Sequence, residues 1–114
     1  MARVLLVEDH DGIHRMLCDA LVHQGHQADC VKTKAEAEQA LASNPYALVI
    51  ANIVLPDGSG SDIAHVAEQR GARTILMTGH PDESQALHVQ EIAHLQKPFS
   101  LDAFEKMVRD RLGA

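Results

Sequence analysis

Four side chains along this chain carry groups that bind metal ions or phosphate. Glu8 and Asp9 are adjacent carboxylates, Thr78 carries a hydroxyl, and Lys97 carries an ammonium group. Carboxylate oxygens suit a divalent cation such as Mg2+, which completes its coordination with water and phosphate oxygens. A hydroxyl and a compact positive charge suit the phosphate oxygens themselves. Each residue alone is an ordinary surface residue, but together they would form a pocket equipped for phosphoryl transfer.

Hydrophobic periodicity predicts that strands and helices alternate along the chain. Five apolar runs predict strands at 3–7, 27–31, 46–52, 73–77 and 92–95. Amphipathic spacing predicts a helix after each strand, near 13–25, 33–44, 63–71, 81–89 and 101–112. Thr33 and Glu36 form a capping-box pattern, and Ser100 can cap the last helix. Continuous apolar strands that alternate with amphipathic helices indicate a parallel sheet covered on both faces, the doubly wound α/β architecture.

The candidate site residues stand where these strands end. In a doubly wound sheet, ligands bind outside the carboxyl ends of the strands. Glu8 and Asp9 follow the first strand, Thr78 follows the fourth, and Lys97 follows the fifth. The third strand ends at Asn52, an amide, and a Pro-Asp-Gly turn comes shortly after it. We therefore expect these five side chains to meet at one edge of the sheet.

Composition and charge narrow the class of protein. The 114 residues fit one compact domain with a sizeable core. A net charge of −6 argues against a general nucleic-acid or anionic-membrane surface. The sequence has no signal peptide and no apolar stretch of membrane length, so we expect a cytoplasmic protein. Cys18 and Cys30 do not make a disulfide framework, and we expect both to be small core residues in a reducing compartment.

Four stretches, RVLLVEDHDGIHRMLCDAL, ALVIANIVLPDGSG, TILMTGH and LQKPF, resemble the receiver domain of two-component response regulators. The resemblance covers nearly the whole chain. It implies a flavodoxin-like, doubly wound, five-stranded parallel sheet of order 2-1-3-4-5 with five helices. It also implies a single receiver domain over residues 1–114, without an effector domain, that signals through protein contacts and is not an enzyme. In that family an acidic pair and an aspartate bind Mg2+, and the aspartate accepts a phosphoryl group from a histidine kinase.

The resemblance assigns a role to each position that matches the family pattern. Glu8, Asp9, Asn52 and the carbonyl of Val54 take the metal-binding positions. Asn52 stands at the phosphoacceptor position, and Thr78 and Lys97 stand where the family contacts phosphate; the Lys97–Pro98 bond is expected to be cis. Thr78 and His94 take the switch positions. The implied partners are a sensor histidine kinase or phosphotransfer protein, and a downstream protein or a second copy bound through the face from Pro81 to Leu112.

Two of these positions depart from the family pattern. Asn52 has no anionic oxygen to attack phosphorus, so we expect phosphorylation to be blocked there and Mg2+ binding to be weakened. The chain is then either a phosphoacceptor domain blocked at Asn52, naturally or by engineering, or a pseudo-receiver that works as an interaction or dimerisation module. His94 is either a pH-responsive replacement for the family's aromatic switch residue or a plain surface histidine.

Three other interpretations are weaker. Asp57 or Asp11 could be a relocated phosphoacceptor, and His10 with His14 could bind zinc from one helix face. A flavodoxin-like small-molecule binder is disfavoured, because the loop EDHDG after the first strand is acidic and not rich in glycine.

Overall fold

A parallel sheet of five strands runs through the middle of the molecule in this computed structural model, which describes residues 2–113. Its order is β2-β1-β3-β6-β7, and every neighbouring pair is parallel. The strands are β1 (Arg3–Val7), β2 (Gln27–Val31), β3 (Leu48–Asn52), β6 (Arg73–Thr78) and β7 (His94–Gln96). Counted among themselves, the sheet strands have the predicted order 2-1-3-4-5. The flavodoxin-like fold class is therefore confirmed.

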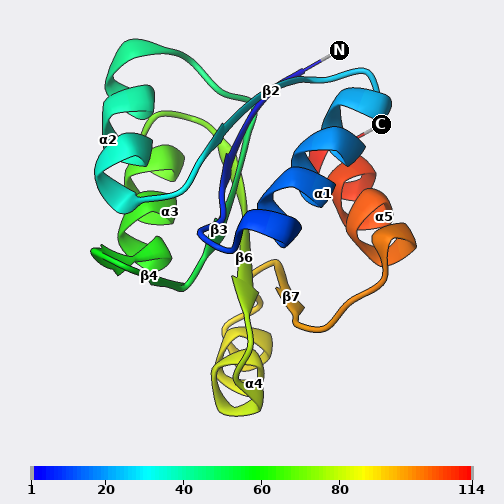
Figure 1. The fold of residues 1–114 in the computed structure, drawn as a ribbon. Coiled ribbons are helices and arrows are strands. Elements are labelled where there is room, and N and C mark those ends of the chain that lie inside the picture. Colours follow the sequence, from blue (N-terminus) through cyan, green and yellow to red (C-terminus); the bar gives the residue numbers. More distant parts are fainter. Residues whose placement is uncertain (1, 114) are drawn as a thin grey trace.

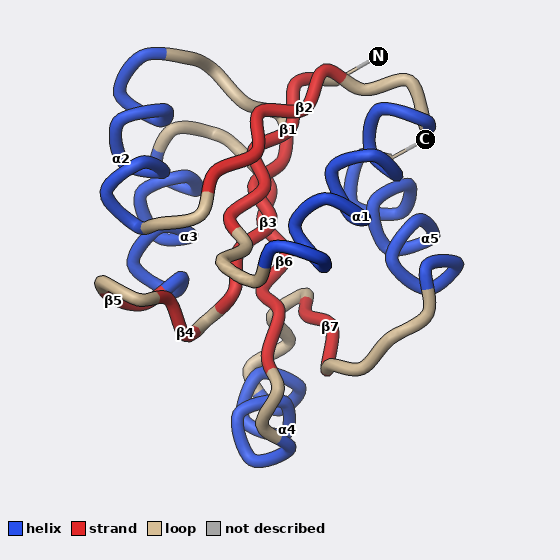
Figure 2. The backbone as a smooth tube through the Cα atoms, viewed as in Figure 1, coloured by secondary structure: helices blue, strands red, loops and turns tan. Residues whose placement is uncertain are grey.

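A short hairpin between β3 and the third helix was not predicted. It pairs β4 (Val54–Leu55) with β5 (Gly58–Ser59) in antiparallel fashion. Figure 2 shows it beside the start of that helix, away from the main sheet. Each strand has two residues, and such a short hairpin leaves little alternation of apolar and polar residues in the sequence.

Helices cover both faces of the sheet. They are α1 (Asp11–His23), α2 (Lys34–Ser43), α3 (Gly60–Gln69), α4 (Pro81–Val89) and α5 (Leu101–Leu112). Figure 1 shows α2 and α3 on one face, α1 and α5 on the other, and α4 beyond the end of β6. Within residues 2–113, no helix is both long enough and apolar enough to cross a membrane.

The two faces of β3 explain why its sequence is a continuous apolar run. All five residues of β3 are buried. Val49 and Ala51 belong to the core cluster that includes residues of α2 and α3, whereas Leu48 and Ile50 belong to the cluster under α1 and α5. A strand covered on both sides has no solvent face on which polar residues could alternate.

The predicted helix caps are present. The Thr33 hydroxyl accepts a hydrogen bond from the Glu36 backbone N–H at 3.1 Å, and the Glu36 carboxylate accepts one from the Lys32 N–H. The Ser100 hydroxyl accepts from the Ala103 N–H at 3.0 Å. These contacts satisfy backbone donors that have no partner within the helix, so the start of each helix is set locally by sequence.

The expectation that Cys18 and Cys30 are separate core thiols is wrong for this structure, in which they form a disulfide. Cys18 lies on α1 and Cys30 on β2, with their Cα atoms 6.2 Å apart. The chain turns at Gly25, between α1 and β2, and the two elements lie in contact. Spacing in the sequence could not show this contact, because the cysteines lie on different elements.

The phenol group of Tyr46 donates a hydrogen bond to a half-buried carboxylate, Asp29. Its hydroxyl donates to Asp29 Oδ2 at 2.7 Å, and the Arg3 guanidinium donates to the same oxygen at 3.0 Å. Burial and the hydrogen bond to Asp29 raise the pKa of Tyr46 to about 12, from 10.0. Both disfavour the phenolate, because it would be poorly solvated and would face a carboxylate.

We expect an absorbance titration of the folded chain to give a tyrosinate midpoint at about pH 12. Tyr46 is the single tyrosine and there is no tryptophan, so the signal reports this residue alone. The unfolded chain in urea is the control and should titrate near 10. Because folding raises this pKa, its contribution to stability is present below pH 10 and is lost as the pH rises through about 12. A folded-state midpoint near 10 would contradict the burial of Tyr46 and its contact with Asp29.

Candidate functional site

The predicted site residues line one cavity at the carboxyl ends of the strands. Its volume is about 260 Å³. Its walls include Glu8, Asp9, Asn52, Val54, Thr78 and Lys97, and also His10, Ile13, Met77, Gly79, His80 and Glu83. The parallel register aligns the ends of β1, β3, β6 and β7, so residues far apart in sequence converge there. His94 does not line this cavity.

Glu8 is the central group of the site. Its side chain is 0% exposed. A carboxylate buried to this extent requires partners that are positively charged or that donate hydrogen bonds. Lys97 Nζ donates to Glu8 Oε1 at 2.6 Å, and the backbone N–H of His10 donates to Oε2 at 3.1 Å. Asn52 Nδ2 also donates to Oε2. These contacts satisfy both oxygens and tie the loop after β1 to β3 and to the residues after β7.

Asn52 joins the two acidic residues. It is 5% exposed, and its Nδ2 donates to Glu8 and, at 2.9 Å, to Asp9 Oδ1. The amide hydrogens lie between carboxylates that would otherwise repel one another. A carboxylate at position 52 would add a third negative charge and no donor. The amide hydrogens therefore reduce the repulsion between the two carboxylates, as a bound cation would.

The donor set also fits a divalent metal ion. Asn52 Oδ1 is buried and, among residues 2–113, has no hydrogen-bond partner. With the carboxylates of Glu8 and Asp9 it supplies hard oxygen ligands of the kind that Mg2+ prefers. In the described part of the chain, no group of three or more His, Cys, Asp or Glu side chains is arranged to hold a metal. The candidate metal site has two such side chains, Glu8 and Asp9, and its third oxygen ligand is the amide of Asn52, so it agrees with that result.

Thr78 is engaged by Glu83, a residue that sequence reasoning missed. The buried Thr78 hydroxyl donates to Glu83 Oε1 at 2.6 Å and accepts from the His80 backbone N–H at 3.1 Å. Glu83 is the third residue of α4, a position from which an acidic side chain can reach back past the start of its helix. Its place in the helix could be predicted from the sequence, but its contact with Thr78 on β6 could not.

His94 is held by two hydrogen bonds at the start of β7. Nδ1 lies 2.7 Å from the Ile92 carbonyl oxygen, and Nε2 lies 3.1 Å from the Ser84 hydroxyl of α4. The ring is half-buried and contacts the helix that carries Glu83. This environment differs from that of a plain surface histidine, and a switch role for His94 stays a prediction.

The alternative phosphoacceptors lie outside the cavity. Both carboxylate oxygens of Asp57 accept backbone N–H bonds from Lys34 and Ala35, which hold the pKa of Asp57 below its usual value. Asp11 pairs with Lys32, and that hydrogen bond and charge lower the pKa of Asp11. Each carboxylate is therefore committed to a structural contact.

The histidine pair gives no support to the zinc interpretation. His10 Nδ1 accepts the Ile13 N–H and caps α1, at 3.3 Å. His14 Nδ1 lies 2.9 Å from the Glu8 carbonyl oxygen. One ring nitrogen of each histidine is thus used in positioning the loop that carries the acidic pair.

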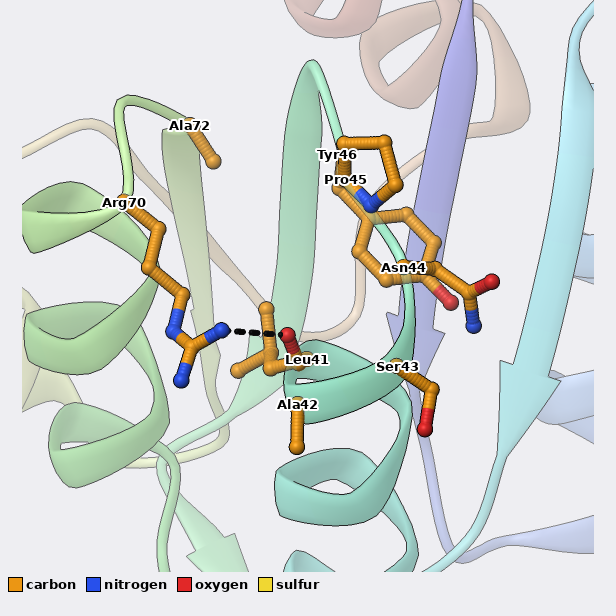
Figure 3. A pocket seen from close by; sticks show the side chains of 8 residues that line it. All are labelled: Leu41, Ala42, Ser43, Asn44, Pro45, Tyr46, Arg70 and Ala72. Carbon is orange, nitrogen blue, oxygen red and sulfur yellow. Dashed lines mark hydrogen bonds between the residues drawn. The ribbon is translucent and has the colours of Figure 1, made fainter.

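A second pocket lies at the opposite, amino-terminal end of the strands (Figure 3). Its walls come from 41–46 and from Arg70 and Ala72. The Arg70 guanidinium donates to the Leu41 carbonyl oxygen at 2.8 Å and so caps the end of α2. This pocket has no carboxylate in its walls, and its one charged group already serves the fold.

The fold and the site together define a class of protein: a doubly wound domain with an acidic pair, a hydroxyl and a lysine gathered at the strand ends. The response regulator receiver domain family matches residues 4–109. The chain belongs to that family, and the resemblance found in the sequence is confirmed. The Lys97–Pro98 bond is cis, as expected.

The chain is similar to proteins described as transcriptional regulators. It is 31% identical over 112 residues to the transcriptional regulatory protein TctD of Salmonella typhimurium, covering 94% of this chain and 50% of TctD. It is 34% identical over 115 residues to KdpE of Mycobacterium tuberculosis, covering 96% of this chain and 50% of KdpE. The chain thus spans about half the length of these relatives.

Solved structures agree with the fold. The non-phosphorylated HemR receiver domain of Leptospira biflexa is 27% identical with a TM-score of 0.85, covering 100% of this chain and 96% of that one. The response regulator TrrA of Thermotoga maritima, solved in complex with Mg(2+)-BeF, is 27% identical with a TM-score of 0.84, covering 97% and 99%.

The backbone behind Asn52 leaves no room for a side chain at Gly60. A Cβ built there would overlap the Asn52 carbonyl oxygen. The Gly60 N–H donates to the Ile53 carbonyl at 2.8 Å, so the start of α3 is pressed against the end of β3. Glycine at position 60 therefore helps to set the position of Asn52.

We expect Gly60→Ala to lower the free energy of unfolding by about 2 kcal/mol or more, because the backbone must move to admit the methyl group. Urea denaturation measures this difference. Gly12→Ala on α1 is the matched control, since its Cβ would lie 3.5 Å from the nearest side-chain atom. That substitution should leave stability unchanged or raise it by up to about 1 kcal/mol. Equal stability of the two variants would contradict the close approach at Gly60.

Proposed function

We propose that this receiver domain transmits a signal through protein contacts and takes no phosphoryl group at position 52. The observation that supports this most directly is the amide of Asn52, which donates to Glu8 and Asp9 at the position of the family's acceptor. A carboxylate can attack phosphorus and hold an acyl phosphate. The amide offers no anionic oxygen, and its nitrogen lone pair is delocalised.

Mg2+ would be held by Glu8, Asp9 and the amide oxygen of Asn52, with Val54, whose carbonyl takes the family's fourth position, in the cavity wall. When bound, it would supply positive charge to phosphate oxygens. The chain's own residues shape the rest of the site: Lys97 neutralises Glu8, and Thr78 is held by Glu83. With Asn52 in place of an aspartate, the site has one negative charge fewer, so Mg2+ binding is weaker.

We propose that the partners are a sensor histidine kinase or phosphotransfer protein, and a downstream protein or a second copy of this chain. We propose that such a partner binds the face from Pro81 to Leu112, where two large apolar side chains, Val89 and Leu101, are 71% and 39% exposed. The net charge of −6 favours no direct contact with nucleic acid. We propose no enzymatic turnover of its own and a cytoplasmic location.

A second candidate is a pseudo-receiver whose partner binding never depends on phosphorylation. It is favoured by the internal pairing of Asn52, Lys97 and Thr78, each of which contacts a carboxylate of this chain. The Asn52→Asp variant separates the two candidates. If phosphorylation of that variant changes its affinity for a partner, the chain is a blocked phosphoacceptor domain; unchanged affinity supports the pseudo-receiver.

Incubation with a small acyl-phosphate donor and Mg2+ should leave the intact mass of the native chain unchanged. Asn52→Asp is the positive control and should gain one phosphoryl group, because the reverted carboxylate restores the nucleophile. Peptide mapping locates any adduct. A phosphoryl group on Asn52 would falsify the block, and one on Asp57 or Asp11 would restore the relocated acceptor.

Calorimetric titration should show that Mg2+ binds the native chain at least about tenfold more weakly than Asn52→Asp, a difference of about 1.4 kcal/mol. The physical reason is the lost charge: two unit charges about 4 Å apart interact by about 4 kcal/mol at an effective dielectric of 20, and relieved repulsion between the carboxylates offsets part of this. Gln39→Glu adds the same charge at an exposed position of α2 and should not change the affinity. Equal affinities of the native chain and Asn52→Asp would contradict the weakening.

A further inference from the structure

Helix α4 is attached to the domain by little apolar surface. Of its nine residues, all of them described, Leu87 alone is buried. Figures 1 and 2 show α4 beyond the end of the sheet, apart from the four helices that cover its faces. A helix with one buried apolar residue gains little from the hydrophobic effect. Its position must therefore depend strongly on polar contacts.

Two adjacent residues in the first half of α4 make those contacts. Glu83 Oε1 accepts the Thr78 hydroxyl at 2.6 Å, and the Ser84 hydroxyl lies 3.1 Å from His94 Nε2. Thr78 is the last residue of β6 and His94 is the first of β7. The helix is thus fastened to two neighbouring strands, and the Glu83 contact is the one that reaches the site cavity.

The hydroxyl of Thr78 can make only one such contact at a time. A threonine hydroxyl has a single proton to donate, and here Glu83 takes it. An anionic phosphate oxygen would be an acceptor of the same kind as this carboxylate oxygen. Any phosphoryl group in the cavity would therefore have to displace Glu83 in order to receive that hydrogen bond.

We propose that Glu83 is a positioning residue that engages the Thr78 hydroxyl in place of a phosphoryl group and so holds α4 against the site without phosphorylation. The inference rests on the proposed function, which makes Thr78 the hydroxyl that contacts phosphate. Glu83 is not among the residues that the family pattern assigned. Its carboxylate accepts the hydrogen bond that a phosphate oxygen would otherwise receive from Thr78.

Hydrogen exchange on the native chain, with no phosphate donor present, tests the contact. Glu83→Ala should raise exchange rates of the amides in α4 by about tenfold, the effect of losing a hydrogen bond to a charged group. Asp82→Ala is the matched control, because it removes the same charge from the same helical turn, and Asp82 is exposed. Unchanged exchange in Glu83→Ala, or an equal rise in Asp82→Ala, would overturn the proposal.

Two further variants separate a specific contact from a general loss of helix stability. Glu83→Gln retains an acceptor oxygen and should restore most of the protection. Thr78→Val removes the donor, and the double variant Thr78→Val with Glu83→Ala should exchange no faster than the more affected single variant, since both remove one interaction. Additive effects would show that the two side chains act independently, against the proposal.

The competition with phosphate is tested in chains that carry Asn52→Asp. With an acyl-phosphate donor, adding Glu83→Ala should increase the phosphorylated fraction by a factor of up to about ten relative to adding Asp82→Ala. Equal fractions would overturn the competition. This result is separate from the proposed block at position 52, which is judged on the native chain by the absence of an adduct at Asn52.

Discussion

The site depends on a fully buried carboxylate, Glu8, and on the two groups that compensate its charge. Taking a carboxylate out of water is costly, and its partners recover that cost only with good geometry. Lys97 comes from the residues after β7 and Asn52 from the end of β3, so the compensation requires both to be in place. Removing either partner would leave a buried charge partly uncompensated. The relative positions of the ends of β1, β3 and β7 thus depend on the contacts of one side chain, that of Glu8.

An amide at position 52 fits this constraint in a way that an aspartate would not. In an aspartate-containing site without metal, a third carboxylate would face Glu8 and Asp9, and a cation would be required to reduce the repulsion. Here the amide hydrogens supply that compensation from within the chain. With an amide at position 52, hydrogen bonds within the chain supply part of the charge compensation that a cation would otherwise provide.

Much of this was predictable from sequence, because it follows from local patterns. The bounds of β1 and β2 and the caps at Thr33 and Ser100 follow from apolar periodicity and capping residues. The order of the sheet was implied by the resemblance to the receiver domain family. The gathering of Glu8, Asn52, Thr78 and Lys97 followed from their places at the strand ends. The direction of each contact did not, since which carboxylate receives Lys97 depends on side-chain geometry across three strands. The Cys18–Cys30 pair and the Thr78–Glu83 bond were missed for the same reason: each joins separate elements.

The disulfide also affects how this domain meets other copies of itself. Strand β2 lies at one edge of the sheet and pairs with β1 on its inner side. Edge strands offer unpaired backbone groups on which another chain can add a strand. The link from Cys30 to Cys18 fastens this edge to α1. In an oxidised chain, β2 therefore cannot leave the sheet independently of α1.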